Sequence, residues 1–209
     1  MRAYGLDLPE YPWETLIPYR KLAAEHPGGT IDLSIGTPVD DTPQLIQDAL
    51  TAASDAPGYP TTHGTAELRQ AIVDWFARRR GVTGLSTDQV MPTVGSKELV
   101  AWLPFLLGLG TDPNTQERDV VVYPRVAYPT YDIGARFAGA QSVPADSLDE
   151  LPKDVRRRVR LVWVNSPANP NGVVRDVAEL RKIVRQARDI GAVVASDECY
   201  AELGWGVWD

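Results

Sequence analysis

Residues 161–172 read Leu-Val-Trp-Val-Asn-Ser-Pro-Ala-Asn-Pro-Asn-Gly, an uninterrupted apolar run followed at once by a turn rich in asparagine and proline. A short apolar run bounded by turn residues is typical of a strand that is buried on both faces of a parallel sheet. Apolar residues then recur at helical spacing between Asp176 and Gly191, and a second apolar run occupies residues 192–195. This order of strand, helix and strand predicts a parallel βαβ unit.

The same alternation extends toward the N-terminus. Residues 120–123, Val-Val-Val-Tyr, predict a further strand that is buried on both faces. Apolar residues at helical spacing predict two earlier helices, over residues 41–50 and 65–80. The chain is therefore expected to form an α/β fold, with a parallel-rich sheet and helices on both of its faces.

The first part of the chain has a different character. Residues 1–30 are rich in proline, tyrosine and glycine and have weak periodicity, which indicates an arm that packs on another surface. Three tryptophans farther along, Trp75, Trp102 and Trp163, lie within apolar runs and are expected in the core.

The composition excludes several classes of function. A formal net charge of −7 and a sequence pI near 4.9 should repel phosphate backbones, so no nucleic-acid partner is expected. The single cysteine, Cys199, excludes an intramolecular disulfide, and two histidines are too few for a spaced metal cluster, so no metal is expected. Without an apolar signal core or a stretch long enough to span a membrane, the sequence predicts a cytoplasmic protein with no membrane association.

Chemically informative side chains follow the predicted strands. In an open parallel sheet, ligands bind beyond the carboxyl ends of the strands, so these residues are the candidates for a site. Asn169 lies in the turn after one strand, and Asp197 and Tyr200 follow the next strand along the chain. Tyr128 comes soon after the run at residues 120–123. The sequence thus predicts amide, carboxylate and aromatic groups at one edge of the sheet.

A glycine-led turn supplies a further candidate. Gly95, Ser96 and Lys97 open the apolar stretch 99–107, so free backbone N–H groups and the positive end of a helix are expected there. Taken singly, a Gly-Ser helix start is most often a plain cap, and an aspartate after a strand most often caps the next helix. Together, and in this order, the signals match a whole site. Cys199 is expected to be a small packing residue and not a nucleophile, because no histidine has a motif-level tie to it.

This order of motifs resembles the class I and II aminotransferases, which are fold-type-I enzymes dependent on pyridoxal 5′-phosphate (PLP). The resemblance covers nearly the full chain and implies two catalytic residues, Asp197 and Tyr200. It implies that the cofactor phosphate is bound by Gly95, Ser96 and Lys97, the last mainly through its main chain. The pyridine ring is then stacked on by Tyr128, and its ring oxygen is contacted by Asn169 and Tyr200. The pyridine nitrogen is contacted by Asp197.

The resemblance also implies features beyond one chain. Tyr59 is expected to reach the cofactor phosphate of a neighbouring subunit in a homodimer, and Gly36 is expected to line the pocket for the substrate carboxylate. Residues 1–40 are then an arm and small-domain segment. Residues 41–209 are then a partial PLP-binding large domain, incomplete at the C-terminus. None of the four lysines occupies the place of the lysine that would hold the cofactor as a Schiff base.

These expectations support two hypotheses on function. A carboxylate at Asp197 would keep the pyridine nitrogen protonated, which lets the ring accept electron density from the substrate. The first hypothesis is a PLP-dependent transfer of an amino group between an amino acid such as glutamate and a keto acid. Residues 11–16 and 35–43 look closest to succinyldiaminopimelate aminotransferases of lysine biosynthesis, which implies N-succinyl-2-amino-6-ketopimelate as the keto acid. The alternative is a truncated, catalytically inactive fragment with the PLP fold.

Overall fold

The computed structural model describes residues 5, 6, 8–10, 12–204 and 206 of the 209-residue chain. Residue 11, used above for the resemblance, lies outside the described residues. The chain divides into two compact units, one formed by residues 1–12 and 93–209 and the other by residues 13–92. The predicted division at residue 40 into a small-domain segment and a large domain stays a prediction.

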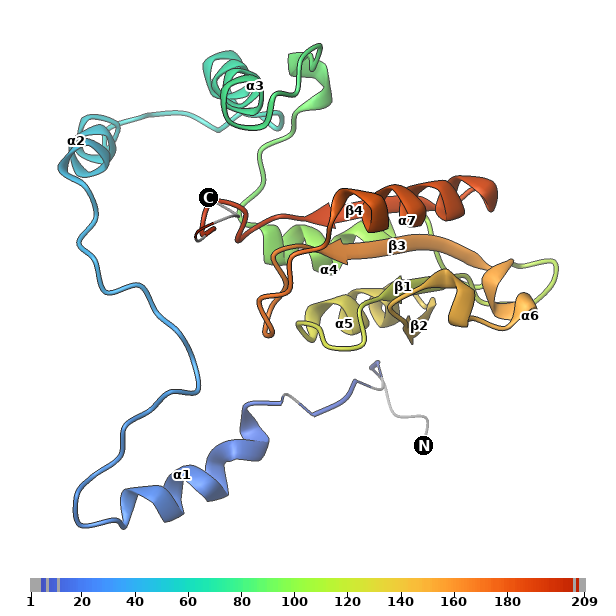
Figure 1. The fold of residues 1–209 in the computed structure, drawn as a ribbon. Helices are drawn as coiled ribbons and strands as arrows, with labels where there is room; N and C mark the ends of the chain where they lie inside the picture. The colour runs from blue at the N-terminus through green and yellow to red at the C-terminus, as the bar shows by residue number, and fades with distance from the viewer. Residues whose placement is uncertain (1–4, 7, 11, 205, 207–209) are drawn as a thin grey trace. The chain divides into compact units, whose positions relative to one another are not determined.

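Residues 13–92 form a helical unit (Figure 1). Its elements are η1 (Glu14–Leu16), α1 (Ile17–Ala24), α2 (Gln44–Ala52), α3 (Ala66–Arg80) and η2 (Thr87–Gln89). Helix α3 begins after Thr65, whose hydroxyl accepts a 3.1 Å hydrogen bond from the Leu68 N–H, and ends at Gly81 with φ of 63°. Both helices predicted in this region are confirmed. No residue of this unit is buried, so it has no closed core of its own in the chain as described.

The other unit is built on a four-stranded parallel sheet with the order β2-β1-β3-β4 (Figure 1). Its strands are β1 (Val120–Tyr123), β2 (Gln141–Pro144), β3 (Val159–Asn165) and β4 (Val193–Asp197). Its helices are α4 (Ser96–Leu106), α5 (Thr130–Phe137), η3 (Leu148–Glu150), α6 (Lys153–Arg156) and α7 (Val177–Asp189). The three strands predicted from the sequence and the βαβ unit formed by β3, α7 and β4 are confirmed.

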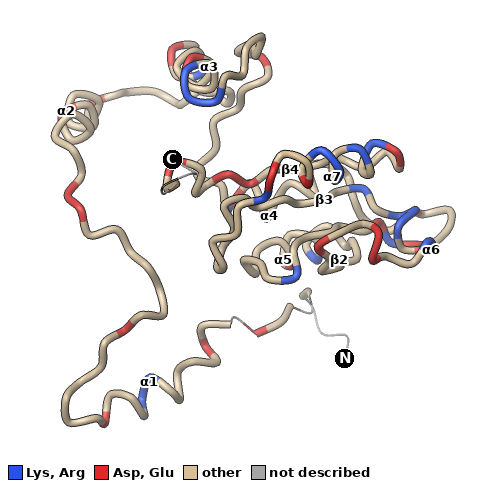
Figure 2. Tube along the Cα trace, viewed as in Figure 1, with Lys and Arg blue, Asp and Glu red and all other residues tan. Residues whose placement is uncertain are grey.

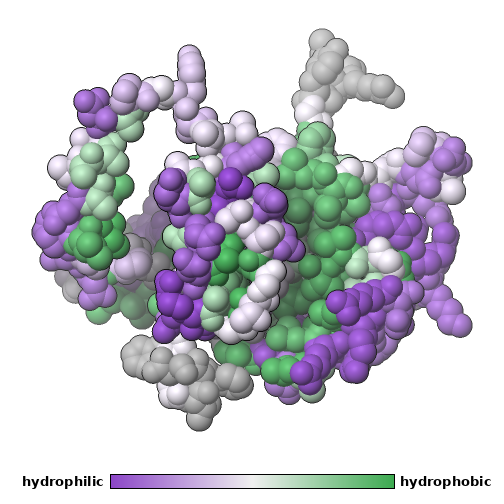
Figure 3. Space-filling view, turned by 90° about the horizontal axis from the view of Figure 1, so that it is seen from above, coloured by the Kyte–Doolittle hydropathy of each residue, from purple (hydrophilic) through white to green (hydrophobic). Residues whose placement is uncertain are grey.

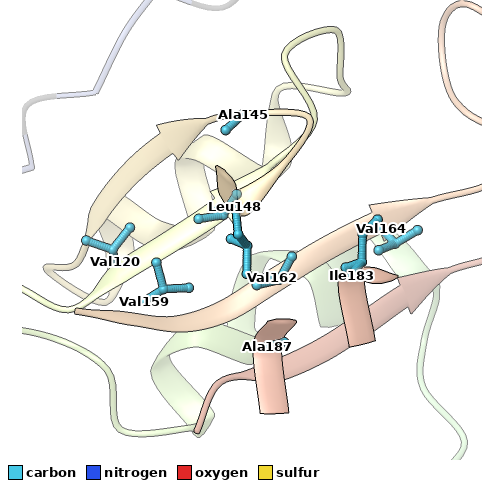
Figure 4. Close-up of a cluster of buried hydrophobic side chains, with 9 residues drawn as sticks. Val120, Ala145, Leu148, Val159, Val162, Val164, Ile183 and Ala187 are labelled. Carbon is cyan, nitrogen blue, oxygen red and sulfur yellow. The ribbon is translucent and has the colours of Figure 1, made fainter. Parts of the chain in front are cut away.

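Alternating residues of the central strands contribute to two separate hydrophobic cores, one on each face of the sheet. On one face, Val162 and Val164 of β3 pack with Ile183 and Ala187 of α7 (Figure 4). On the other face, Leu161 and Trp163 belong to a cluster that includes residues of α4 and α5. Successive strand residues point to opposite faces, so a continuous apolar run fills both cores. The prediction of helices on both faces of a parallel sheet is therefore confirmed.

Two predictions about burial are wrong. The run at residues 192–195 was expected to be buried on both faces, but β4 is the last strand of the described sheet, and Val193 is 46% exposed. Trp102 was expected in the core, yet it is 47% exposed, although its ring lies 6.3 Å from the ring of Phe137 in α5. Trp163 is buried as predicted, and Trp75 is half-buried. Figure 3 shows hydrophobic residues gathered on the face seen from above, next to hydrophilic ones.

Helix α7 shows how local signals place an element. The Asp176 carboxylate accepts a 2.7 Å hydrogen bond from the Glu179 N–H, which caps the helix, and Gly191 follows its end with φ of 71°. The carboxylate of Glu179 pairs with Arg175, so the reciprocal half of a capping box is replaced by an ion pair. Basic residues recur along α7 (Figure 2). Among the described residues, no helix is long and apolar enough to cross a membrane.

Candidate active site

The carboxyl ends of β3 and β4 bring the predicted site residues to one edge of the sheet. Asn165 and Asp197 are the last residues of these strands and are in register with each other. The turn after β3 carries Asn169, and the turn after β4 carries Tyr200. The side-chain amide of Asn169 donates a 3.3 Å hydrogen bond to the Tyr200 oxygen. Three of the residues predicted to contact the pyridine ring of PLP are therefore neighbours.

Asp197 accepts hydrogen bonds from two donors, and neither was predicted from the sequence. The Tyr131 phenol donates a 2.7 Å hydrogen bond to Oδ2 of Asp197, and the Cys199 N–H donates a 3.2 Å bond to Oδ1. Burial and this contact with Asp197 raise the pKa of Tyr131 well above its usual range, so the phenol stays protonated and can act as a donor. The only sequence signal for Tyr131 is its place three residues after Tyr128.

The ring of Tyr131 is fixed by its surroundings. It is 1% exposed and lies 5.2 Å from the ring of Trp163, measured between centroids. The ring of Tyr123 stacks against it at 6.5 Å. Because these neighbours restrict the rotation of the Tyr131 ring, the phenol oxygen has a fixed position next to the Asp197 carboxylate.

The glycine-led turn lies where the sequence predicts it. Gly95 is the N-cap of α4 with φ of 134°, a conformation that favours glycine, and Ser96 is the first residue of the helix. The first backbone N–H groups of such a helix have no partner within it, and the helix dipole favours an anion there. The Lys97 ammonium lies 5.5 Å from the centroid of the Tyr128 ring. This contact joins the start of α4 to the aromatic residue predicted to stack on the cofactor.

Cys199 is a poor nucleophile in this setting. It is an exposed residue, yet partial burial of the thiol and the nearby Asp197 carboxylate raise its pKa to about 11. Few thiols are ionised at neutral pH with such a pKa. The expectation that Cys199 is a small packing residue is wrong, because the residue is exposed. Among the described residues, no group of three or more histidine, cysteine, aspartate or glutamate residues could hold a metal ion.

A cavity of about 430 Å³ opens beside the Asn169–Tyr200 pair. Its lining includes Pro167, Pro170, Val174 and Leu203, together with Asn169 and Tyr200. None of the described residues that line it carries a charge. The cavity therefore offers an apolar wall next to the amide and the phenol.

Two predicted site residues lie in the other unit. Gly36 is in the exposed segment between α1 and α2, and Tyr59 follows α2 with a fully exposed side chain. Their expected functions, in the carboxylate pocket and at the phosphate of a neighbouring subunit, stay predictions.

Comparison with known proteins agrees with this geometry. Residues 29–209 match the family described as aminotransferase class I and II. The 4-dedimethylamino-4-oxo-anhydrotetracycline transaminase OxyQ of Streptomyces rimosus is 53% identical over 95% of this chain and 53% of its own length. An LL-diaminopimelate aminotransferase of Aquifex aeolicus is 33% identical over 95% of this chain and 53% of its own length. The crystal structure of an aminotransferase from Neisseria meningitidis superposes with a TM-score of 0.83 at 30% identity, covering 94% of this chain and 52% of that one.

The chain spans about half the length of the curated relatives it matches. Within that span, the family match includes the start of α4, the turns after β3 and β4, and the whole parallel sheet. The structural likeness at 30% identity covers the same region. The chain therefore belongs to the class I and II aminotransferases, a family of enzymes that depend on pyridoxal 5′-phosphate.

Proposed function

We propose that the protein transfers an amino group between an amino acid and a keto acid with PLP as cofactor, and that this chain supplies the non-covalent part of the PLP site. The observation that carries the proposal is the cluster at the edge of the sheet, where Asn169 bonds to Tyr200 beside the buttressed carboxylate of Asp197. A carboxylate, an amide and a phenol at one strand edge match the polar groups around a pyridine ring.

The residues present fit the cofactor group by group. PLP carries a phosphate, a ring nitrogen, a ring oxygen and an aromatic face. Ser96 and the first N–H groups of α4 would hold the phosphate, and Tyr128 would stack on the ring. Asp197 would face the ring nitrogen, and Tyr200 would face the ring oxygen. When bound, PLP supplies a ring that accepts electron density from the Cα of the substrate.

Each polar residue of the chain has a definite task in this proposal. Asp197 would hold a proton at the ring nitrogen, because a nearby negative charge favours the protonated form. The Tyr200 oxygen accepts the bond from Asn169, which leaves the Tyr200 proton for donation to the ring oxygen. In a homodimer, Tyr59 would reach the phosphate held by a second copy, and Gly36 would line the pocket for the substrate carboxylate.

Binding of PLP to the purified chain tests the proposal. Asp197→Ala removes a charged partner of the ring and should weaken PLP binding by about 10-fold or more in equilibrium dialysis. Asp189→Ala is the matched control, because Asp189 is an exposed carboxylate at the end of α7. It should change the dissociation constant by less than about twofold. Equal effects of the two substitutions, or no saturable binding to the unaltered chain, would reject the proposed site.

We propose further that glutamate and N-succinyl-2-amino-6-ketopimelate are the substrates, which assigns the reaction to diaminopimelate and lysine biosynthesis. Support comes from residues 35–43, which resemble succinyldiaminopimelate aminotransferases, and from the relatives named LL-diaminopimelate aminotransferase. A polycyclic ketone is the second candidate, because the wall of the cavity beside Asn169 is uncharged and one relative is named for an anhydrotetracycline substrate.

The two substrates are distinguished by steady-state kinetics. Because the chain spans about half the length of its relatives, the assay uses the full-length product of the gene. A higher kcat/KM for the succinylated ketopimelate than for a polycyclic ketone supports the first assignment. Turnover of the polycyclic ketone alone favours the second, and absence of both reactions in a protein that binds PLP excludes both substrates.

A further inference from the structure

One buried polar side chain joins the two turns of the site. Asn165 ends β3 and is 2% exposed. The side-chain amide of Asn165 donates to the backbone oxygens of Asp197, at 3.0 Å, and Pro167, at 3.2 Å. Its side-chain oxygen accepts a 2.7 Å hydrogen bond from the Asn169 N–H. Asn165 thus uses both of its amide hydrogens and its oxygen.

These bonds connect parts of the chain that the sheet alone does not connect. Asp197 ends β4, whereas Asn169 lies in the turn after β3 and has no strand partner. The backbone N–H of Ser166 adds a 3.2 Å bond to the same Asp197 oxygen. Two hydrogen-bond donors, the Asn165 side-chain amide and the Ser166 N–H, therefore hold the end of β4 against the turn at residues 165–169. The distance between the side chains of Asp197 and Asn169 depends on these contacts.

We propose that Asn165 is a positioning residue, which fixes the spacing between Asp197 and Asn169 so that both can contact one cofactor ring. The proposal rests on the PLP site described above. Asn165 would touch neither the cofactor nor the substrate, and it would act only through the two residues that it holds.

The geometry requires an asparagine. The position needs two donors and one acceptor on a short planar group, and asparagine alone offers this set at that length. Aspartate has the same shape but, when ionised, only accepts hydrogen bonds, so it would face the oxygens of Asp197 and Pro167 without a proton to share. Leucine has a similar branched shape but a larger volume and no polar atom. Either residue leaves buried backbone groups without partners, which favours a shift of the turn.

The test compares two asparagines of the same turn in PLP binding. Asn165→Asp should raise the dissociation constant by about 10-fold or more, measured well below the unfolding temperature with unchanged far-UV circular dichroism. Asn171→Asp is the control, because Asn171 is exposed and its side chain bonds only to the N–H of Val173, at 3.2 Å. It should change the constant by less than about twofold. Similar constants for the two variants would overturn the proposal.

A double-mutant cycle separates positioning from a general loss of stability. If Asn165 acts partly through Asn169, then Asn165→Asp should cost less in an Asn169→Ala background than in the unaltered chain. Equal costs in both backgrounds contradict action through Asn169.

Amide hydrogen exchange supplies a readout that needs no variant. The Asn169 N–H should exchange slowly, since it bonds to a buried oxygen, whereas the Asn171 N–H should exchange quickly in the same turn. Fast exchange at Asn169 would overturn the inference even if the Asn165 variants do not fold. Failure of the unaltered chain to bind PLP counts against the proposed function, and the exchange measurement then still decides whether Asn165 holds the turn.

Discussion

The phenol of Tyr131 and the carboxylate of Asp197 form a 2.7 Å hydrogen bond between residues that are 66 positions apart in the chain. The bond crosses from the first turn of α5 to the end of β4. It gives Asp197 a neutral donor on the side away from its own turn. The orientation of the carboxylate is therefore set by two elements, α5 and β4.

Tyr131→Phe removes this donor and keeps the ring that packs on Trp163. We expect the dissociation constant for PLP to rise by about 5- to 10-fold, because Asp197 loses one of its two side-chain partners. The loss of unfolding free energy in urea should be about 1 kcal/mol. Tyr123→Phe is the control, since Tyr123 stacks on the same ring but makes no contact with Asp197. A weaker effect of Tyr131→Phe than of Tyr123→Phe would contradict the assignment.

Gly134 of α5 packs closely against the backbone of α4. A Cβ atom at this position would lie 2.8 Å from the Val100 carbonyl oxygen and 2.9 Å from that of Ala101. Gly134→Ala should therefore push the two helices apart and reduce the unfolding free energy by about 1–3 kcal/mol. Gly36→Ala, where nothing lies within 4 Å, should be neutral within about 0.5 kcal/mol. Urea denaturation of both variants checks the difference.

Two glycines with positive φ allow backbone strain to be separated from function. Gly95 precedes α4 with φ of 134°, and Gly191 follows α7 with φ of 71°. A methyl group at either position would meet no atom within 4 Å. Alanine at either position should cost about 1–2 kcal/mol of stability through strain. Only Gly95→Ala should also weaken PLP binding, since the start of α4 is the proposed phosphate anchor. Equal binding by the two variants would exclude that anchor.

Cys199 provides a prediction on pH dependence. Its pKa is raised from an ordinary value near 9.0 to about 11, so the folded chain favours the neutral thiol. At pH 8, alkylation of the folded chain by iodoacetamide should be roughly 100-fold slower than alkylation of the unfolded chain. The rate should rise with pH up to about 11. The same shift makes this group's contribution to stability complete below pH 9 and lost as the pH rises toward 11. Equal rates for folded and unfolded chains would be inconsistent with this environment.

The sequence by itself determined the kinds of elements and their order. Continuous apolar runs predicted β1 and β3 because both faces of a central parallel strand are apolar. Caps and helical spacing predicted α3 and α7. Since parallel strands end at one edge, the sequence also indicated that Asn169, Asp197 and Tyr200 would be neighbours.

Only the tertiary structure decided which side chains support these residues and which apolar ones stay exposed. Tyr131 and Asn165 have no motif that marks them, because their contacts come from packing between α5, β3 and β4. Likewise, Trp102 and Val193 are apolar by sequence, but their exposure depends on what covers α4 and β4. Local patterns report the propensity of a segment, whereas partners distant in sequence are chosen by the packing of the whole sheet.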